Sequence, residues 1–190
     1  MRMERDPVCG MMVGEWERQV VYRGVGYAFC SQQCRERFSS SPGLYVRRRR
    51  LAPKQIGMEV IKHRRIVLDV PLTHAEFVEL KRALLSMMGV MEVWSDKETS
   101  DVGGGMQTLE YHAQTFTRID AVEISYDLLQ ATAAQIERRL VDLNALPRNG
   151  WGEKLQRDFI HYMERCELDD LEAYDTDPVR WGRGTRRVAS

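Results

Sequence analysis

Apolar and polar positions within residues 59–148 follow patterns that predict a small α+β domain. Runs rich in β-branched residues predict strands at 63–70, 90–94 and 121–126, with a further strand candidate at 108–117. Two stretches with apolar residues at helical spacing predict helices, one from Thr73 to about Met88 and one over 132–143. The predicted order is strand, helix, strand, strand, helix.

Local signals support the two helices. Thr73 and Glu76 have the spacing of a capping box, and Gly89 is suited to end the helix that they begin. The apolar face of the first helix consists of Phe77, Leu80, Leu84 and Met87, and that of the second of Ala133, Ile136, Leu140 and Leu143.

A further helix is predicted over 153–174, within a C-terminal amphipathic unit at 149–174. Its apolar stripe consists of Leu155, Phe159, Tyr162, Met163 and Cys166, and we interpret Cys166 as a packed core residue. His161 lies off this stripe and is predicted to be exposed. Residues 175–190 are interpreted as a flexible tail.

The first 34 residues contain three cysteines, Cys9, Cys30 and Cys34, in an otherwise cysteine-poor chain. Two strand-like runs, at 16–22 and 26–29, predict a hairpin that returns Cys30 to Cys9. Ser31 is placed to cap a helix that begins Gln32-Gln33-Cys34, so that Cys30 and Cys34 straddle its first turn, and the helix dipole there is expected to lower the thiol pKa. Thiolates are soft donors, so the pattern indicates a site for copper(I) or zinc.

Other readings of these cysteines stay open at this point. Free cysteines often pack as small apolar residues, and Cys30 with Cys34 would also have the sequence spacing for a disulfide. A disulfide is disfavoured where the thiols are kept reduced, as they are inside cells.

Residues 5–45 resemble the YHS domain, of the wider TRASH group of treble-clef-like metal-binding modules. The resemblance rests on Asp6-Pro7-Val8-Cys9-Gly10-Met11, Tyr22-x-Gly24, Tyr27-x-Phe29-Cys30-Ser31, Cys34, Phe38, Pro42 and Tyr45. It implies binding of heavy-metal ions. Many YHS domains have histidine where this chain has Cys30, so this site is softer. Asp6, a water, a ligand from a partner or a three-coordinate copper(I) site would complete the coordination.

Residues 59–148 resemble a degenerate heavy-metal-associated domain, which has a ferredoxin-like βαββα(β) fold. The similarity lies in Val67-Leu68-Asp69-Val70, Met88-Gly89-Val90 and 122–127. The Cys-x-x-Cys of that family is absent, because its loop here reads Pro71-Leu72-Thr73-His74-Ala75, and a lone His74 is a poor chelator. Residues 145–148 are very short for a fourth strand, so either that strand is minimal or the C-terminal helix covers the open edge. An uncovered edge would favour a homodimer.

Composition limits the remaining possibilities. The 190 residues carry a formal net charge of zero, but residues 1–50 have ten Arg against five acids, and residues 151–178 have nine acids against three bases. No apolar run approaches the length of a membrane span and no signal-peptide core is present, which favours a cytoplasmic protein. Residues 46–58, with the run Arg47–Arg50, are interpreted as a linker, and binding to nucleic acid is disfavoured.

These observations favour a heavy-metal-binding protein that acts in metal trafficking, buffering or resistance. Its expected partner is a heavy-metal P-type ATPase or another metal-handling protein. The alternative is a metal-responsive regulatory or interaction subunit. The four histidines all lie beyond residue 62 and no catalytic motif is present, so we predict that the chain is not an enzyme.

Overall fold

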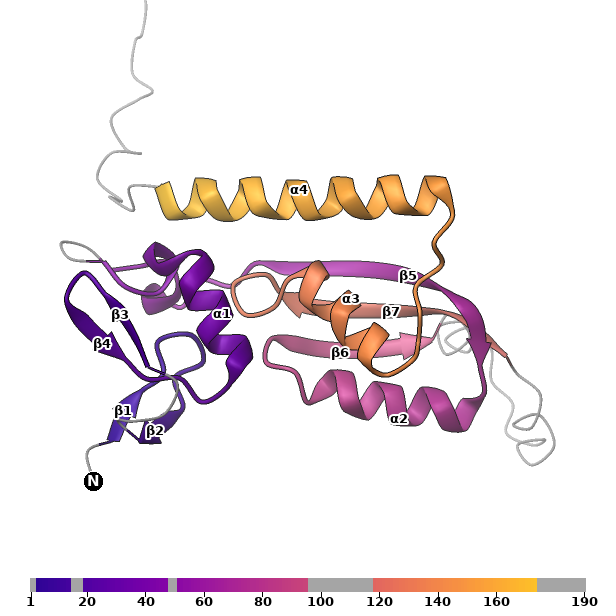
Figure 1. Ribbon diagram of the computed structural model, residues 1–190, viewed down its shortest axis with the longest axis horizontal. Helices are drawn as coiled ribbons and strands as arrows, with labels where there is room; N and C mark the ends of the chain where they lie inside the picture. The colour runs from indigo at the N-terminus through magenta and orange to yellow at the C-terminus, as the bar shows by residue number, and fades with distance from the viewer. Residues whose placement is uncertain (1–2, 15–18, 48–50, 96–117, 174–190) are drawn as a thin grey trace, which may run out of the picture.

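The computed structural model describes residues 3–14, 19–47, 51–95 and 118–173. The N-terminal part contains two short hairpins and a helix, and the central part contains a three-stranded sheet with two helices (Figure 1). The α+β class predicted from the sequence is confirmed. The strand candidate at 108–117 lies outside the described residues.

The N-terminal part is built from very short strands. Strand β1 (Met3–Arg5) pairs with β2 (Met12–Gly14), and β3 (Val20–Tyr22) pairs with β4 (Val25–Tyr27), both antiparallel. Arg23 and Gly24, between β3 and β4, both have positive φ, of 52° and 80°, as the central residues of a type I′ hairpin turn require. Helix α1 (Gln32–Ser40) and the short 3-10 helix η1 (Pro42–Leu44) complete this part.

The central sheet has the strand order β5-β7-β6, and both pairs are antiparallel. The elements are β5 (Ile61–Leu72), α2 (His74–Leu85), β6 (Val90–Ser95), β7 (Ile119–Asp127) and α3 (Ala133–Asp142). On the outer side of β5, Leu68 forms an isolated bridge with Pro147. The Asp69 amide donates to the Leu146 carbonyl at 2.8 Å, and the Arg148 amide to the Val67 carbonyl at 2.8 Å. The expected fourth strand is therefore reduced to this single bridge.

Helices α2 and α3 share one face of the sheet. Their apolar residues form one buried cluster with those of the strands, among them Ile66, Leu68, Phe77, Leu80, Leu84, Val93, Val122, Ile124, Ile136 and Leu140. The predicted capping box of Thr73 with Glu76 begins α2, and a second one, Thr132 with Gln135, begins α3. The apolar faces predicted for the two helices are confirmed by this packing.

The N-terminal part packs directly against the turn that joins β7 to α3. Phe38 and Tyr45 share a second buried cluster with Leu128, Leu129 and other residues. Between the two parts, the 3-10 helix η2 (Lys54–Ile56) places Lys54 Nζ at 2.9 Å from the carboxylate of Asp127, which is 2% exposed. Residues 52–58, which the sequence suggested as part of a linker, are thus held against the sheet. The domain boundaries drawn from the sequence stay predictions.

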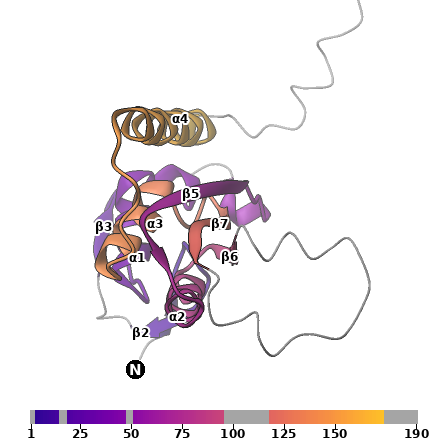
Figure 2. The same cartoon turned by 90° about the vertical axis from the view of Figure 1, so that its right-hand side faces the viewer.

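Helix α4 (Trp151–Ala173) runs beside β5 and reaches the N-terminal part (Figures 1 and 2). The predicted burial of its apolar stripe is wrong: Phe159 and Tyr162 are 61% and 63% exposed, and Cys166 is half-buried. The prediction for His161 is also wrong, because this side chain is partly covered and lies 3.2 Å from the Glu137 carboxylate. No helix among the described residues is long and apolar enough to span a membrane.

Candidate metal centre

Three chain segments bring Cys9, Cys30 and Cys34 together. The first is the turn between β1 and β2, where the Gly10 amide donates to the Asp6 carbonyl and the Asp6 amide to the Met11 carbonyl, each at 2.8 Å. Gly10 has a φ of 80°, which a side chain would disfavour. The second segment follows β4 and carries Cys30, and the third is the first turn of α1, which carries Cys34. The predicted hairpin return of Cys30 to Cys9 is confirmed.

The start of α1 is also as predicted. Ser31 is the N-cap residue, and its hydroxyl accepts a hydrogen bond from the Cys34 amide at 3.1 Å. Cys30 and Cys34 therefore flank the cap and face the same point, with their sulfurs 3.7 Å apart. The sulfurs of Cys9 and Cys30 are 3.4 Å apart. No disulfide joins the cysteines in the described residues, which include all four of the chain.

The arrangement fits a metal ion. One ligand atom from each of Asp6, Cys9, Cys30 and Cys34 lies within 4.8 Å of all the others. Sulfurs that each lie about 2.3 Å from one ion are about 3.8 Å apart in a tetrahedral site, close to the separations found here. Cys34 is buried while Cys9 and Cys30 are half-buried, so an ion would enter from the side of Cys9 and Cys30.

Asp6 holds the segments of this site together. Its carboxylate is fully buried, and Oδ1 accepts from the amide of Val8 at 2.8 Å and from that of Cys9 at 3.4 Å. Oδ2 accepts from the amide of Cys30 at 2.9 Å. The sequence suggested Asp6 only as a completing ligand and gave no sign of these bonds, which depend on the folded hairpins. Both carboxylate oxygens are occupied by backbone donors that position two of the three cysteines.

The thiol pKa values differ from the sequence expectation. Burial raises the pKa of Cys9 to about 12; a hydrogen bond with the Met11 backbone opposes this rise, and the neighbouring Cys30 thiol and the Asp6 carboxylate add to it. Burial also raises the pKa of Cys34 far above its usual value, and the hydrogen bond with Ser31 opposes this only in part. The predicted lowering by the helix dipole is therefore overcome by loss of solvent. At neutral pH an incoming ion must displace protons from these two thiols.

The other candidate ligands lie elsewhere. His74 is exposed at the start of α2, His161 faces Glu137, and Cys166 lies beside Tyr162 on α4. Within the described parts of the chain, the group around Cys9 is the only one of three or more Cys, His, Asp or Glu side chains that could hold an ion.

The metal site is joined to the central domain through the residue between two of its cysteines. Gln33 lies on the first turn of α1, and its side chain donates to the Met88 carbonyl at 2.6 Å and accepts from the Met88 amide at 3.3 Å. It also donates to the Gln130 carbonyl at 3.3 Å. Gly89 is required beside this contact, since a Cβ there would lie 2.5 Å from the Gln130 side chain. Sequence reasoning missed this connection because Gln33 has no local signature.

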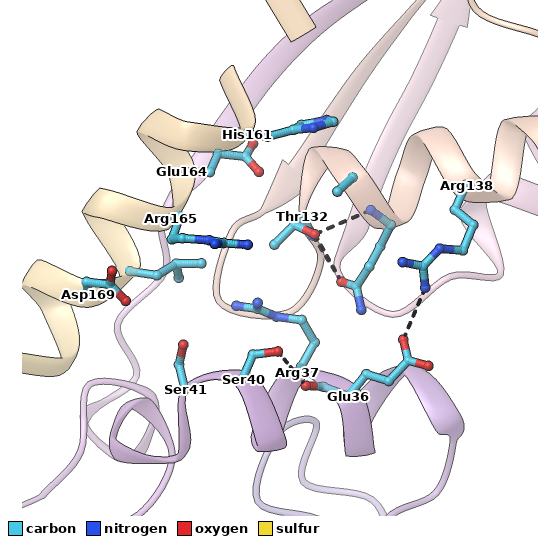
Figure 3. Close-up of a pocket in the computed structure, with 13 residues that line it drawn as sticks. Glu36, Arg37, Ser40, Ser41, Thr132, Arg138, His161, Glu164, Arg165 and Asp169 are labelled. Carbon is cyan, nitrogen blue, oxygen red and sulfur yellow. Dashed lines mark hydrogen bonds and ion pairs between the residues drawn. The ribbon is translucent and has the colours of Figure 1, made fainter. Parts of the chain in front are cut away.

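A hollow of about 500 Å³ lies between α1, the start of α3 and α4 (Figure 3). Its lining includes three arginines, Arg37, Arg138 and Arg165, and three acids, Glu36, Glu164 and Asp169. Arg138 is 3.5 Å from Glu36, Arg37 donates to the Leu128 carbonyl at 3.0 Å, and Glu164 is bound by the Tyr126 hydroxyl and the Ala133 amide. These charges balance, so the hollow shows no preference for an anion or a cation.

Comparison with known proteins agrees with the site. The family model of the YHS domain matches residues 5–49, which include all three cysteines and Asp6. No curated protein and no solved structure matches the chain. The match covers the N-terminal part alone.

Proposed function

We propose that this chain binds a soft metal ion, copper(I) or zinc, through the thiolates of Cys9, Cys30 and Cys34. The observation that carries the proposal is the convergence of three sulfurs from three segments, within a stretch that matches the YHS domain. Asp6 acts as a positioning residue, because both of its oxygens accept backbone hydrogen bonds. Copper(I) is favoured over zinc, since it accepts three soft ligands whereas a structural zinc ion normally has four protein ligands.

The role proposed for this site is metal trafficking, buffering or resistance in the cytoplasm, accessory to a heavy-metal P-type ATPase or another metal-handling protein. A three-thiolate site with two half-buried sulfurs leaves room for an incoming ligand from a partner to bind before the first ligands leave. The central domain is proposed to be ferredoxin-like, on the strand order β5-β7-β6 with the Pro147 bridge outside β5. The chain itself is proposed to catalyse no reaction.

The test is a titration of reduced, metal-free protein with copper(I) and, separately, with zinc. We expect one ion per chain for the wild type, and loss of that binding when Cys9, Cys30 or Cys34 is replaced singly by Ser. Cys166→Ser is the matched control and should bind as the wild type does. Stoichiometric binding that persists in all three site variants would overturn the proposal.

The second candidate is a metal-responsive interaction subunit, favoured by the contact of Gln33 with Met88 and Gln130. Gln33 precedes Cys34 on the same helical turn. A shift in the position of Cys34 when it binds metal would therefore move Gln33 and alter its contacts with the central domain. Amide hydrogen exchange of residues 86–90 and 128–133, with and without metal, separates the candidates. A regulator should show changed protection there, and a carrier should show changes confined to residues 5–40.

A further inference from the structure

Helix α4 presents one apolar side to solvent. Trp151, Leu155, Phe159, Tyr162 and Met163 are between 48% and 85% exposed, and Trp151 is the most exposed of them. They follow one another at helical steps, with Cys166 next, so they lie on one side of the helix. A helix that packs on a globular domain normally turns this side inward.

The inner side of α4 is held mainly by polar contacts. Glu164 binds the Tyr126 hydroxyl and accepts from the Ala133 amide at 2.9 Å. His161 and Arg157 lie 3.2 and 3.8 Å from the Glu137 carboxylate, and the carboxylate of Glu167 lies 2.6 Å from Lys62 Nζ. The hollow described above lies beneath this side of the helix (Figure 3). Among the described residues of α4, Ile160, Leu168 and Leu171 make apolar inner contacts. The polar inner side therefore fixes α4 in this orientation and leaves the apolar side outward.

The exposed stripe is large enough for a specific interface. Full burial of side chains of this size removes about 200 Å² each, so the five exposed residues offer about 600 Å² in total. A stable complex buries about 800 Å² per partner, so the stripe with its immediate flanks approaches that size. Monomers seldom leave a continuous apolar patch of this extent uncovered.

We propose that α4 packs antiparallel against α4 of a second copy of this chain, in a two-fold symmetric dimer. Leu155, Phe159, Tyr162 and Cys166 are separated by four, three and four residues, the spacing of a coiled-coil seam. A two-fold interface uses the same patch on both copies, and a single straight apolar stripe meets that condition.

The charges on α4 set the direction of pairing. Residues 151–160 carry Glu153, Lys154, Arg157 and Asp158 and have no net charge, whereas residues 161–173 carry five acids and only Arg165 as a base. Parallel pairing would place the two acidic halves together, and antiparallel pairing places each acidic half beside a neutral half. The same excess of acid disfavours an anionic membrane surface as the occupant, because helices that lie on such surfaces are rich in Lys and Arg.

The test measures the mass of the full chain in solution by sedimentation velocity, over a range of micromolar concentrations. A chelator and a reductant are present, so that neither a shared ion nor a disulfide can join two copies. We expect a reversible monomer–dimer equilibrium. Phe159→Glu and Leu155→Glu should each weaken the dimer at least about 10-fold, since they place charges in the seam. Val78→Glu is the control, because Val78 is an apolar residue of α2 that is 47% exposed outside the stripe.

Far-UV circular dichroism of each variant should match the wild type, because the replaced side chains are exposed. Direction is read by placing a photo-cross-linking amino acid at Leu155 and mapping its links in mixed light and heavy isotope samples. Antiparallel pairing predicts links to the second half of α4 in the other copy. A wild type that stays monomeric throughout, binds vesicles as a monomer, loses its dimer equally in Val78→Glu, or cross-links to the first half of α4 overturns the proposal.

Discussion

The role of Asp6 gives the sharpest prediction about the metal site, and the perturbation is Asp6→Asn. The carboxylate accepts from the amides of Val8 and Cys30 at 2.8 and 2.9 Å, and more distantly from Cys9. An asparagine keeps one acceptor oxygen and turns the other into a donor, so at least one buried amide loses its acceptor. A hydrogen bond to a charged group contributes about 1.5–3 kcal/mol to stability. In the variant the asparagine NH2 group would face a backbone N–H, and the repulsion between these two donors adds to the loss. We expect the metal-free protein to lose about 2–4 kcal/mol of unfolding free energy.

Metal affinity should fall as well. If Asp6 positions the cysteines and does not bind the ion, Asp6→Asn should weaken copper(I) binding by about 10–100-fold, as loss of a group that orients metal ligands does, while the three thiolates still form the inner shell. If Asp6 were a ligand, X-ray absorption of the copper(I)-loaded wild type would show an oxygen in the inner shell, and Asp6→Asn would change that shell.

The assays are urea unfolding of the reduced, metal-free protein and competition with a chromophoric copper(I) chelator. Asp120→Asn, at an exposed position of β7, is the control and should change neither quantity. An Asp6→Asn variant as stable as the wild type would refute the proposed hydrogen-bonding role. An inner-shell oxygen in the copper(I)-loaded wild type that is changed in Asp6→Asn, or an affinity that Asp6→Asn leaves unchanged, would refute the positioning role.

Three further predictions concern stability. Burial raises the pKa of Cys9 and that of Tyr45 to about 12 in the folded, metal-free protein. The contribution of these protonated groups to the free energy of unfolding should therefore be complete below about pH 9 and be lost as the pH rises toward 12, as urea unfolding at graded pH will show. Burial acts to raise the pKa of Asp127, but hydrogen bonds from Lys54 and backbone donors outweigh burial and lower that pKa. The contribution of the Asp127 carboxylate to the free energy of unfolding should therefore be present above about pH 4 and be lost on acidification. Asp127→Asn should destabilise the protein by about 3 kcal/mol and flatten that acid limb in the same assay, and an unchanged limb would contradict this. Phe38→Ala, which removes a ring within 6.1 Å of four other aromatic rings, should lower the unfolding free energy by about 3–5 kcal/mol in denaturant titrations, and a loss below about 1 kcal/mol would contradict its place in the core.

Local sequence signals located most of the elements correctly. The capping box at Thr73, the N-cap at Ser31 and the apolar faces of α2 and α3 each depend on residues within one or two helical turns, so the sequence alone carries them. The convergence of the three cysteines also followed from local reasoning, because a hairpin and a helix start suffice to bring them together.

The remaining features depend on contacts that are distant in sequence. The apolar stripe of α4 predicts that this side of the helix faces the domain. In the structure the opposite side faces the domain, because Glu164 and His161 bind residues 126, 133 and 137. The raised thiol pKa of Cys34 also depends on burial in the folded chain, where Cys34 shares a buried cluster with Leu128 and Leu129. Neither effect has a signal in the flanking residues.

The central claim, that Cys9, Cys30 and Cys34 bind one soft ion together, is tested most directly by X-ray absorption spectroscopy of the protein loaded with one equivalent of copper(I). The account predicts an inner shell of three sulfurs at about 2.3 Å, and a shell reduced to fewer sulfurs when Cys34 is replaced by Ser. An inner shell dominated by nitrogen or oxygen, or one that is unchanged in Cys34→Ser, would contradict it.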